Sequence, residues 1–284
     1  MNKSRFLVFA FAAFFSAAAI FVTAQVVINA ATFSDVITES DITRLAEGTP
    51  PTNNWVLYTR NAGNAAFRVG PGSPPAGIGS IEFSTPTGAD KAYLFNYDHV
   101  GTALSNINAI SYSTYRTSGA AANQVPALNI EVDYNGPDAS GGFVTLVFEP
   151  VYNTNQGAIM DGTWQAWNAY AGGEATWWST KNIPGVCAFD CFVSWSDIVT
   201  ANPDAVILGG FGINQGSGNP ALTASADDLS IAYGEDSYNY NFEPFEVPAN
   251  RDQCKNGGWQ TLRRADGSSF KNQGDCIQYV NTGR

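Results

Sequence analysis

Apolar and polar side chains alternate with a period of two along most of the chain from residue 55 onward. In residues 128–133, for example, Leu, Ile and Val point to one face of an extended chain, and Asn, Glu and Asp point to the other. β-Branched and aromatic residues fill such stretches, and clusters of Gly, Pro and Asn separate them. The pattern predicts about a dozen strands, at residues 55–60, 65–69, 78–84, 91–97, 107–115, 127–134, 143–149, 163–170, 175–179, 205–213, 229–233 and 238–242.

Helical spacing of apolar residues is confined to two short stretches. Residues 194–202 begin with a capping serine and end just before Pro203, which predicts a short helix. A second short helix is expected to begin at Ser40 or Asp41 and to run to Leu45.

Helices do not alternate with the strands, so the pattern argues against a parallel α/β fold. Many short strands with frequent turn signals are typical of two packed antiparallel sheets. We therefore expect an all-β fold, a two-sheet antiparallel β-sandwich of the jelly-roll or lectin-like kind. A short helix and a small C-terminal appendage closed by a disulfide complete it.

The first residues have the pattern of an export signal. Lys3 and Arg5 precede an apolar run over residues 6–22, and small residues follow at 22–24. Residues 1–24 are therefore interpreted as a signal peptide. A retained membrane anchor is the alternative, because a run of about 17 apolar residues is at the lower limit for crossing a bilayer. We expect a secreted or cell-surface protein with no membrane segment after cleavage.

Composition divides the rest of the chain into four parts. Residues 25–50 form a lead-in segment, and residues 51–243 form the sandwich domain. A proline-containing linker at 244–253 joins the sandwich to a tail at 254–284, which is too short to build a core unaided and depends on its own cysteine pair.

The charge of the chain bears on its partners. The formal net charge is −11, and removing residues 1–24 takes away two basic and no acidic side chains, which gives −13. Such a surface repels nucleic acid and anionic lipid, so neither is an expected partner.

The chain has four cysteines, Cys187, Cys191, Cys254 and Cys276. An exported protein folds in a compartment that permits disulfides. Three connectivities are possible, and the spacing favours the two local pairs. Zinc is the alternative, but no second cysteine pair lies near Cys187 and Cys191, and the single histidine, His99, is far away in sequence.

Two segments of the tail resemble a C-terminal element of many secreted bacterial proteins. They are Cys254-Lys255-Asn256-Gly257-Gly258-Trp259, with a hairpin-turn signal, and Phe270-Lys271-Asn272-Gln273-Gly274-Asp275-Cys276, with a second turn-like stretch. The body, at residues 50–60, 94–99, 147–152 and 209–218, resembles an uncharacterised family of secreted bacterial β-sandwich proteins that carry this tail. The resemblance implies no activity. The tail is either a sorting or attachment signal or a terminal hairpin that packs on the sandwich.

A weaker resemblance is to the jelly rolls of carbohydrate-binding modules. It depends on Asp227 and Asp228, which open the stretch 227–231. In those modules, aspartates at such a position often help to hold a structural calcium ion, so the resemblance implies calcium here. The alternative is that these aspartates simply open a strand. The acidic loop 133–138 also carries oxygen ligands spaced loosely like those of a calcium site, and the alternative there is an ordinary turn.

Few residues suit catalysis. A Ser-His-acid triad would need His99, and the chain has no Gly-x-Ser-x-Gly elbow. Glu131, Asp133 and Glu149 fall on neighbouring predicted strands, and a pair of carboxylates at the right spacing is what a glycosidase needs. The alternative is that these carboxylates are solvated on the polar face of their strands.

The aromatic cluster at residues 164–178 is the most suggestive feature. Sugar rings stack on exposed indoles, so we take Trp164, Trp167, Tyr170 and Trp178 as candidate ligand contacts. The alternative is that most of these rings lie in the core, since Trp177 and Trp178 must point to opposite faces of one strand.

The sequence thus predicts a secreted, non-catalytic protein that binds carbohydrate or another extracellular surface polymer, without a cofactor other than the possible calcium ion. One alternative is a structural or cell-surface protein with a C-terminal sorting element. The other is a glycoside-active enzyme with paired carboxylates.

Overall fold

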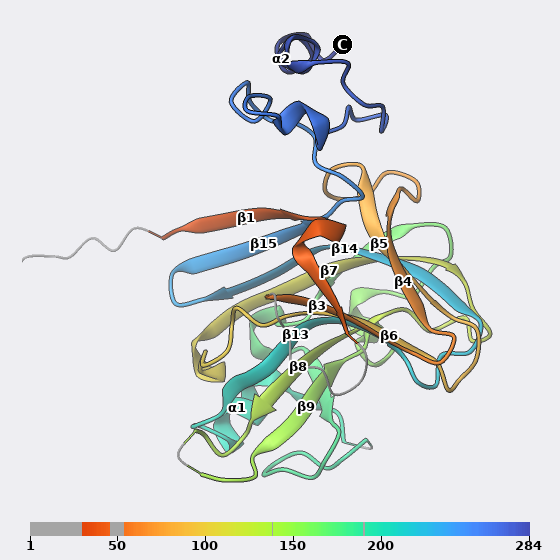
Figure 1. Cartoon of the computed structure of the whole chain (residues 1–284). Coiled ribbons are helices and arrows are strands. Elements are labelled where there is room, and N and C mark those ends of the chain that lie inside the picture. The colour runs from red at the N-terminus through yellow and green to blue at the C-terminus, as the bar shows by residue number, and fades with distance from the viewer. Residues whose placement is uncertain (1–29, 46–53, 138, 190) are drawn as a thin grey trace, which may run out of the picture.

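The computed structural model describes residues 30–45, 54–137, 139–189 and 191–284. It confirms an all-β fold, in which two sheets hold most of the regular secondary structure and the helices are short (Figure 1). The predicted signal peptide lies outside the described residues. In the part that the structure describes, no helix has the length and apolar character needed to cross a bilayer.

The seven-stranded sheet is built around the long strand β14, which pairs along one edge with β7, and β7 pairs in turn with β10. On its other edge, the first half of β14 pairs with β5 and the second half with β15, so the sheet forks there. The branch through β5 ends in β4, and the branch through β15 ends in β1. The bounds are β1 Thr32–Ile37, β4 Asn64–Val69, β5 Gly79–Thr85, β7 Ile107–Ser118, β10 Trp164–Asn168, β14 Leu222–Tyr233 and β15 Asp236–Phe242.

The eight-stranded sheet has the order β12-β11-β9-β8-β13-β6-β3-β2. Its bounds are β2 Ile42–Leu45, β3 Trp55–Arg60, β6 Lys91–Asn96, β8 Ala127–Asp133, β9 Phe143–Phe148, β11 Thr176–Ser179, β12 Val193–Ser194 and β13 Val206–Gly216. The predicted helix at 194–202 is confirmed as α1, Trp195–Ala201, and Ser194 caps it by accepting from the Asp197 amide. Single 3-10 turns lie at Glu39–Asp41, Leu104–Asn106, Pro150–Tyr152, Thr154–Gln156, Ala171–Gly173 and Gly258–Gln260.

The core lies between the two sheets, where inward side chains of alternating strand positions meet. Its largest fully buried side chains are aromatic: Trp167, Trp177, Tyr112, Phe83, Phe148, Phe211 and Phe242. The outward positions of the same strands remain available for other contacts.

The lead-in segment corrects two predictions. β1 pairs in parallel with β15, and β2 pairs in parallel with β3, so the sheets are mixed rather than purely antiparallel. The helix expected at residues 40–45 is wrong, because a 3-10 turn with a capping box on Thr38 is followed directly by β2. The run Ile42-Thr43-Arg44-Leu45 gains a complete strand partner in β3, and this outweighs its weak helical spacing. The segment is therefore part of the sandwich. The finer likeness to a jelly roll stays a prediction.

The tail forms a small unit at one end of the molecule, above the sandwich in Figure 1. Its own apolar cluster consists of Cys254, Leu262, Phe270 and Cys276. The turn-like stretch predicted at 270–275 is instead the start of helix α2, Gln273–Thr282, because the Asn272 side chain accepts from the Asp275 amide and caps it.

Both local disulfides form, one between Cys187 and Cys191 and the other between Cys254 and Cys276. The predicted pairing is therefore confirmed. With all four sulfurs in disulfides, none is left as a thiolate ligand for zinc.

Candidate functional site

The outer face of the eight-stranded sheet carries a hollow of about 320 Å³ above strands β11, β9, β8 and β13. Strand register builds its floor: Trp178 lies opposite Val147, Val147 opposite Asn129, and Asn129 opposite Gly212. Cross-strand partners share a face, so these side chains point outward together while their neighbours point into the core. The loop 216–219 and the side chains of Gln124 and Lys91 complete the lining.

Two aromatic rings form one wall of the hollow. The ring of Trp178 lies 5.4 Å from that of Phe189, with 38° between their planes. Phe189 lies within the short ring that the Cys187–Cys191 disulfide closes, has a left-handed φ of 63°, and is 59% exposed. A non-glycine residue in this conformation is uncommon, and such residues concentrate at ligand-binding sites. The disulfide thus holds an apolar ring over the hollow.

A carboxylate adjoins this wall. The Glu149 Oε2 atom accepts a hydrogen bond from the Trp178 indole nitrogen at 2.9 Å. Burial raises the pKa of Glu149, and the indole hydrogen bond partly offsets that effect. The bond also fixes the plane of the indole, so the apolar face of Trp178 is presented in one orientation.

Three side-chain amides line the hollow, and their oxygens have no hydrogen-bond partner among the described residues: Gln124, Asn129 and Asn214. Two of these amides are held by one hydrogen bond each: Asn214 Nδ2 donates to Gly216 O at 3.0 Å, and Gln124 Nε2 donates to Gly218 O at 3.1 Å. Asn129 and Asn214 are only 6% and 9% exposed. An unmet buried acceptor costs about 1–3 kcal/mol. Such a group calls for an explanation. One explanation is a donor from a water or a ligand, which a small rotation of the amide brings within reach.

The far side of the hollow is polar and aromatic. Lys91 Nζ lies 5.5 Å from the centroid of the Tyr93 ring, and burial lowers the pKa of Lys91. Further along the face, Glu131 Oε2 accepts from the Gly210 amide at 2.7 Å. A side chain at Gly212 would collide with the Leu94 carbonyl, so the glycine-rich run on β13 keeps this part of the face flat.

The four aromatic residues predicted as ligand contacts do not come together. Trp167 is 1% exposed and its indole donates to Thr114 Oγ1, so its role as a surface contact is wrong: it alternates inward on β10. Trp164 lies on the other sheet and donates to Pro71 O, and Tyr170 packs against the core. Of the four, only Trp178 lines the hollow.

Of the three carboxylates considered for catalysis, Glu149 is kept apart from Glu131, whereas Glu131 and Asp133 are two residues apart on β8. Glu149 follows β9 at the position opposite Ala127, four residues along β8 from Glu131, which puts their Cα atoms about 14 Å apart. Glu131 bonds toward β13 and Glu149 bonds toward β11, in opposite directions across the sheet. Asp133 is buried at the end of β8 and accepts from the Asn135 amide.

The predicted calcium ligands, Asp227 and Asp228, lie at the fork of the seven-stranded sheet and point to different surroundings. Asp227 is fully buried, and its two oxygens accept from the amides of Phe242 and Ala76. Asp228 is exposed at a bulge with a φ of 54°. Within the described ranges no three His, Cys, Asp or Glu side chains are grouped so as to hold a metal ion, so the calcium hypothesis gains no ligand set.

His99 is 1% exposed and packed among aromatic rings. Its Nε2 and Nδ1 atoms face the hydroxyls of Tyr240 and Tyr233, at 2.9 and 3.3 Å. Burial lowers its pKa to about 4. A ring enclosed in this way has no path to an external substrate.

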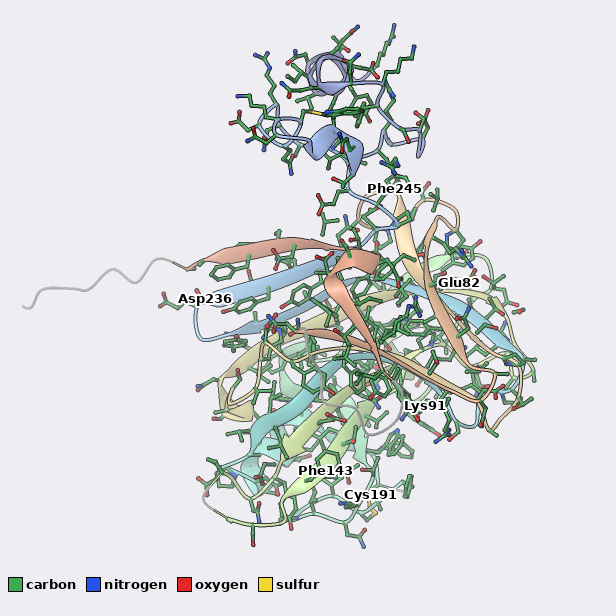
Figure 2. All side chains as sticks on the ribbon, viewed as in Figure 1. Glu82, Lys91, Phe143, Cys191, Asp236 and Phe245 are labelled. Atoms are coloured by element: carbon green, nitrogen blue, oxygen red, sulfur yellow. A yellow bond between two sulfur atoms is a disulfide. The ribbon has the colours of Figure 1, made fainter. Side chains whose placement is uncertain are left out.

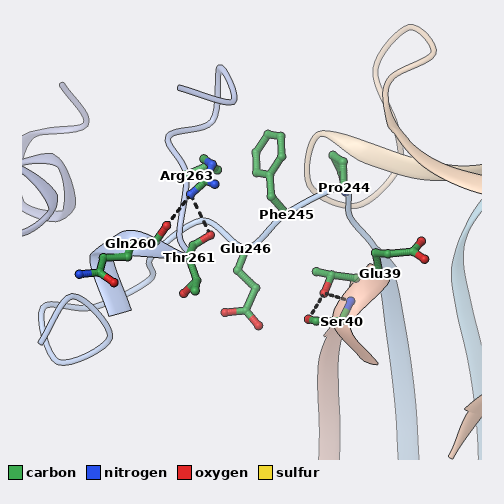
Figure 3. Close-up of a pocket in the computed structure, with 9 residues that line it drawn as sticks. Glu39, Ser40, Pro244, Phe245, Glu246, Gln260, Thr261 and Arg263 are labelled. Carbon is green, nitrogen blue, oxygen red and sulfur yellow. Dashed lines mark hydrogen bonds between the residues drawn. The ribbon is translucent and has the colours of Figure 1, made fainter. Parts of the chain in front are cut away.

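A larger hollow of about 610 Å³ lies between the sandwich and the tail (Figure 3). The one cationic group in its lining, the Arg263 guanidinium, already donates to the backbone carbonyls of Gln260, Thr261 and Leu262. This hollow also lacks the unmet buried polar atoms that mark the outer face, as far as the described residues show. We therefore favour the hollow at Trp178.

Sequence patterns missed most of this site. Phe189 and Gln124 lie in loops without strand periodicity, and the role of Asn129 and Asn214 depends on which neighbours they lack. The placement of Glu149 beside Trp178 follows from strand order, which alternation alone does not give. Comparisons with models of protein families, with curated proteins and with solved structures found no match to this chain.

Proposed function

We propose that this chain is a secreted, non-catalytic β-sandwich protein that binds carbohydrate of an extracellular or cell-surface polymer in the hollow at Trp178. The observation that carries the proposal is the pairing of an aromatic wall, half-buried Trp178 and exposed Phe189, with buried amide oxygens that have no partner among the described residues. Sugars present both an apolar ring face and hydroxyl donors, so one ligand suits both features.

Each part of the site has a distinct role in this proposal. The apolar face of a sugar stacks on Trp178 and Phe189. Its hydroxyls donate to Glu149 and to the amide oxygens of Asn129 and Asn214, which removes the cost of leaving those acceptors unmet. The indole hydrogen bond to Glu149 orders the aromatic wall before the ligand arrives, so binding loses less side-chain entropy.

Export is part of the same proposal. Two disulfides are typical of proteins that fold in an oxidising compartment. They agree with the signal peptide expected at residues 1–24 and with the resemblance of the tail to that of secreted bacterial proteins.

Affinity electrophoresis through gels containing neutral polysaccharides tests the proposal, together with a glycan array. We expect wild-type protein to be retarded and Trp178→Ala to lose at least about fivefold in affinity, since stacking on one aromatic ring is worth roughly 1–2 kcal/mol. Trp164→Ala is the matched control, because Trp164 is a half-buried indole on the other sheet. Retention that depends on Trp164 and not on Trp178, or no retention at all, would contradict the proposal.

A second candidate function concerns the tail. Its apolar cluster and disulfide are separate from those of the sandwich, as expected of a sorting or attachment element. Fusing residues 254–284 to an exported reporter tests this role. An unchanged location of the reporter would count against it.

A further inference from the structure

A second pair of exposed aromatic rings lies beside the wall formed by Trp178 and Phe189. The rings of Tyr152 and Phe192 are 4.0 Å apart with 32° between their planes, and the two residues are 46% and 41% exposed. Large apolar side chains that are exposed as a group, rather than singly, mark interaction surfaces.

Strand register places this second pair on the same face as the first. Trp177 lies opposite Val193 in the last pair of β11 with β12, and Phe192 directly precedes Val193 as Trp178 directly follows Trp177. Successive side chains of an extended chain point to opposite faces, so Trp178 and Phe192 both project on the face opposite to that of Trp177. Tyr152 is in the 3-10 turn that begins one residue after Glu149, and the charge of Glu149 contributes, after burial, to a raised pKa of Tyr152.

The two aromatic pairs and the amide-lined hollow together make up a surface that we call the strip. A single sugar occupies only part of such a strip. The chain also carries a net charge of −11, and Glu149 borders the strip, so an anionic polymer is repelled.

We infer that the site binds an internal stretch of an uncharged glycan chain, with Tyr152 and Phe192 forming a second sugar-stacking platform next to that of Trp178 and Phe189. This inference rests on the proposed function and specifies its ligand. Neighbouring sugars of one chain occupy the two platforms, and the hollow receives the hydroxyls of the sugar on Trp178.

The test is isothermal titration calorimetry with the full chain and oligomers of one to six sugars. The probes are β-1,4-linked glucose, β-1,3-linked glucose and β-1,4-linked N-acetylglucosamine, with polygalacturonate as the anionic counterpart. For the oligomer that binds, we expect affinity to rise at least about tenfold from one sugar to four, as a second stacked ring contributes.

Variants separate the two platforms. The double variant Tyr152→Ala/Phe192→Ala is expected to lose that rise while its affinity for the shortest bound oligomer stays within twofold of wild type. Trp178→Ala is expected to weaken binding at every length. Met160→Ala is the matched control, because Met160 is a 51% exposed apolar residue outside the strip, and it should behave as wild type. Circular dichroism checks that each variant is folded.

Three results would overturn the inference and leave the proposed function standing. They are affinity that does not depend on oligomer length, a double variant with the same length dependence as wild type, and polygalacturonate bound as tightly as the neutral oligomers. Failure of every saccharide to bind wild-type protein would remove the proposed function itself. Binding of an unglycosylated apolar peptide in that case would assign the strip to a protein partner.

Discussion

At the scale of single residues, Asp227 has a structural role that follows from its place in the sheet. β14 exchanges one partner strand for another at this point, so nearby amides lack the carbonyls that strand pairing supplies elsewhere. The two carboxylate oxygens of Asp227 accept from Phe242 and Ala76, and Glu243 accepts from Ile78 at the same fork. Buried carboxylate oxygens thus take the place of the backbone carbonyls that strand pairing supplies elsewhere.

Replacing Asp227 with Asn is expected to lower the free energy of unfolding by about 2–3 kcal/mol, because the amide turns one buried acceptor into a donor that faces another donor. Urea unfolding followed by tryptophan fluorescence measures the change. Asp228→Asn is the matched control: the side chain is exposed, and Asn tolerates the left-handed φ, so a change within about 0.5 kcal/mol is expected. Equal effects of the two substitutions would contradict this role.

His99 provides a test of burial by titration. It is the single histidine of the chain, so its ring resonances are unambiguous in an NMR titration, and the expected midpoint is about pH 4. Because this pKa is lowered from 6.5, the unfolded chain binds the proton first, and His99 contributes a loss of stability as pH falls from 6.5 to 4. The loss amounts to about 3 kcal/mol at most. Burial raises the pKa of Asp227 from 3.8 to about 7, which has the opposite sign, because stability is then lost as pH rises from 3.8 to 7. The midpoint of His99 is therefore the cleaner observable, and a value at or above 6.5 would show that the ring is not enclosed.

Individual site residues were only partly predictable from sequence. Alternation correctly indicates that Trp177 and Trp178 point to opposite faces. It does not say which face of a strand is the core, and this is why Trp167 was expected at the surface. Glu149 was considered only as a catalytic group, because its bond to Trp178 depends on β9 and β11 being neighbours.

At the scale of elements, strands with clear alternation were predictable and the edges were not. Each of the twelve predicted ranges overlaps a strand of the structure, although 229–233 covers only the last part of β14. β1 was missed because its sequence, TFSDVI, mixes polar and apolar residues, and five of its six residues are exposed. Helix α2 was missed although Asn272 and Gly283 mark its two ends, since Gly274 in its first turn favours a turn interpretation.

The tail is expected to depend on its disulfide more than the sandwich does. Its apolar cluster includes both cysteines, and opening a loop of about 22 residues removes roughly 3 kcal/mol of stabilisation. Replacing Cys254 and Cys276 with Ser should abolish slow hydrogen exchange in residues 254–284 while β13 and β14 keep theirs. Mass spectrometry of exchanged peptides measures this.

The matched control is the Cys187→Ser/Cys191→Ser variant, which opens the other disulfide and should leave the exchange of the tail unchanged. Tail protection that survives the loss of Cys254 and Cys276 would show that the sandwich, and not the disulfide, holds the tail in place.

At the scale of the whole molecule, the two candidate functions lie at opposite ends. Figure 2 places Cys191, in the loop that carries Phe189, far from Phe245, where the tail joins the sandwich. A glycan-binding face can therefore point away from whatever the tail attaches to. The overall architecture was predictable because composition and alternation determine the layers of the fold. The site was not, because it depends on which strands are neighbours.

The central claim is that a glycan binds on the outer face of the eight-stranded sheet at Trp178. Its most direct test is a titration of wild-type protein with a bound oligosaccharide, followed through the indole N–H resonances of the tryptophans in ¹H–¹⁵N NMR spectra. The account predicts that the Trp178 resonance shifts in proportion to saturation, because its N–H bonds to Glu149 at the binding site. The resonances of Trp167 and Trp177, which donate inside the core to Thr114 and Ala169, stay in place. A shift at Trp164 with none at Trp178 would contradict the claim.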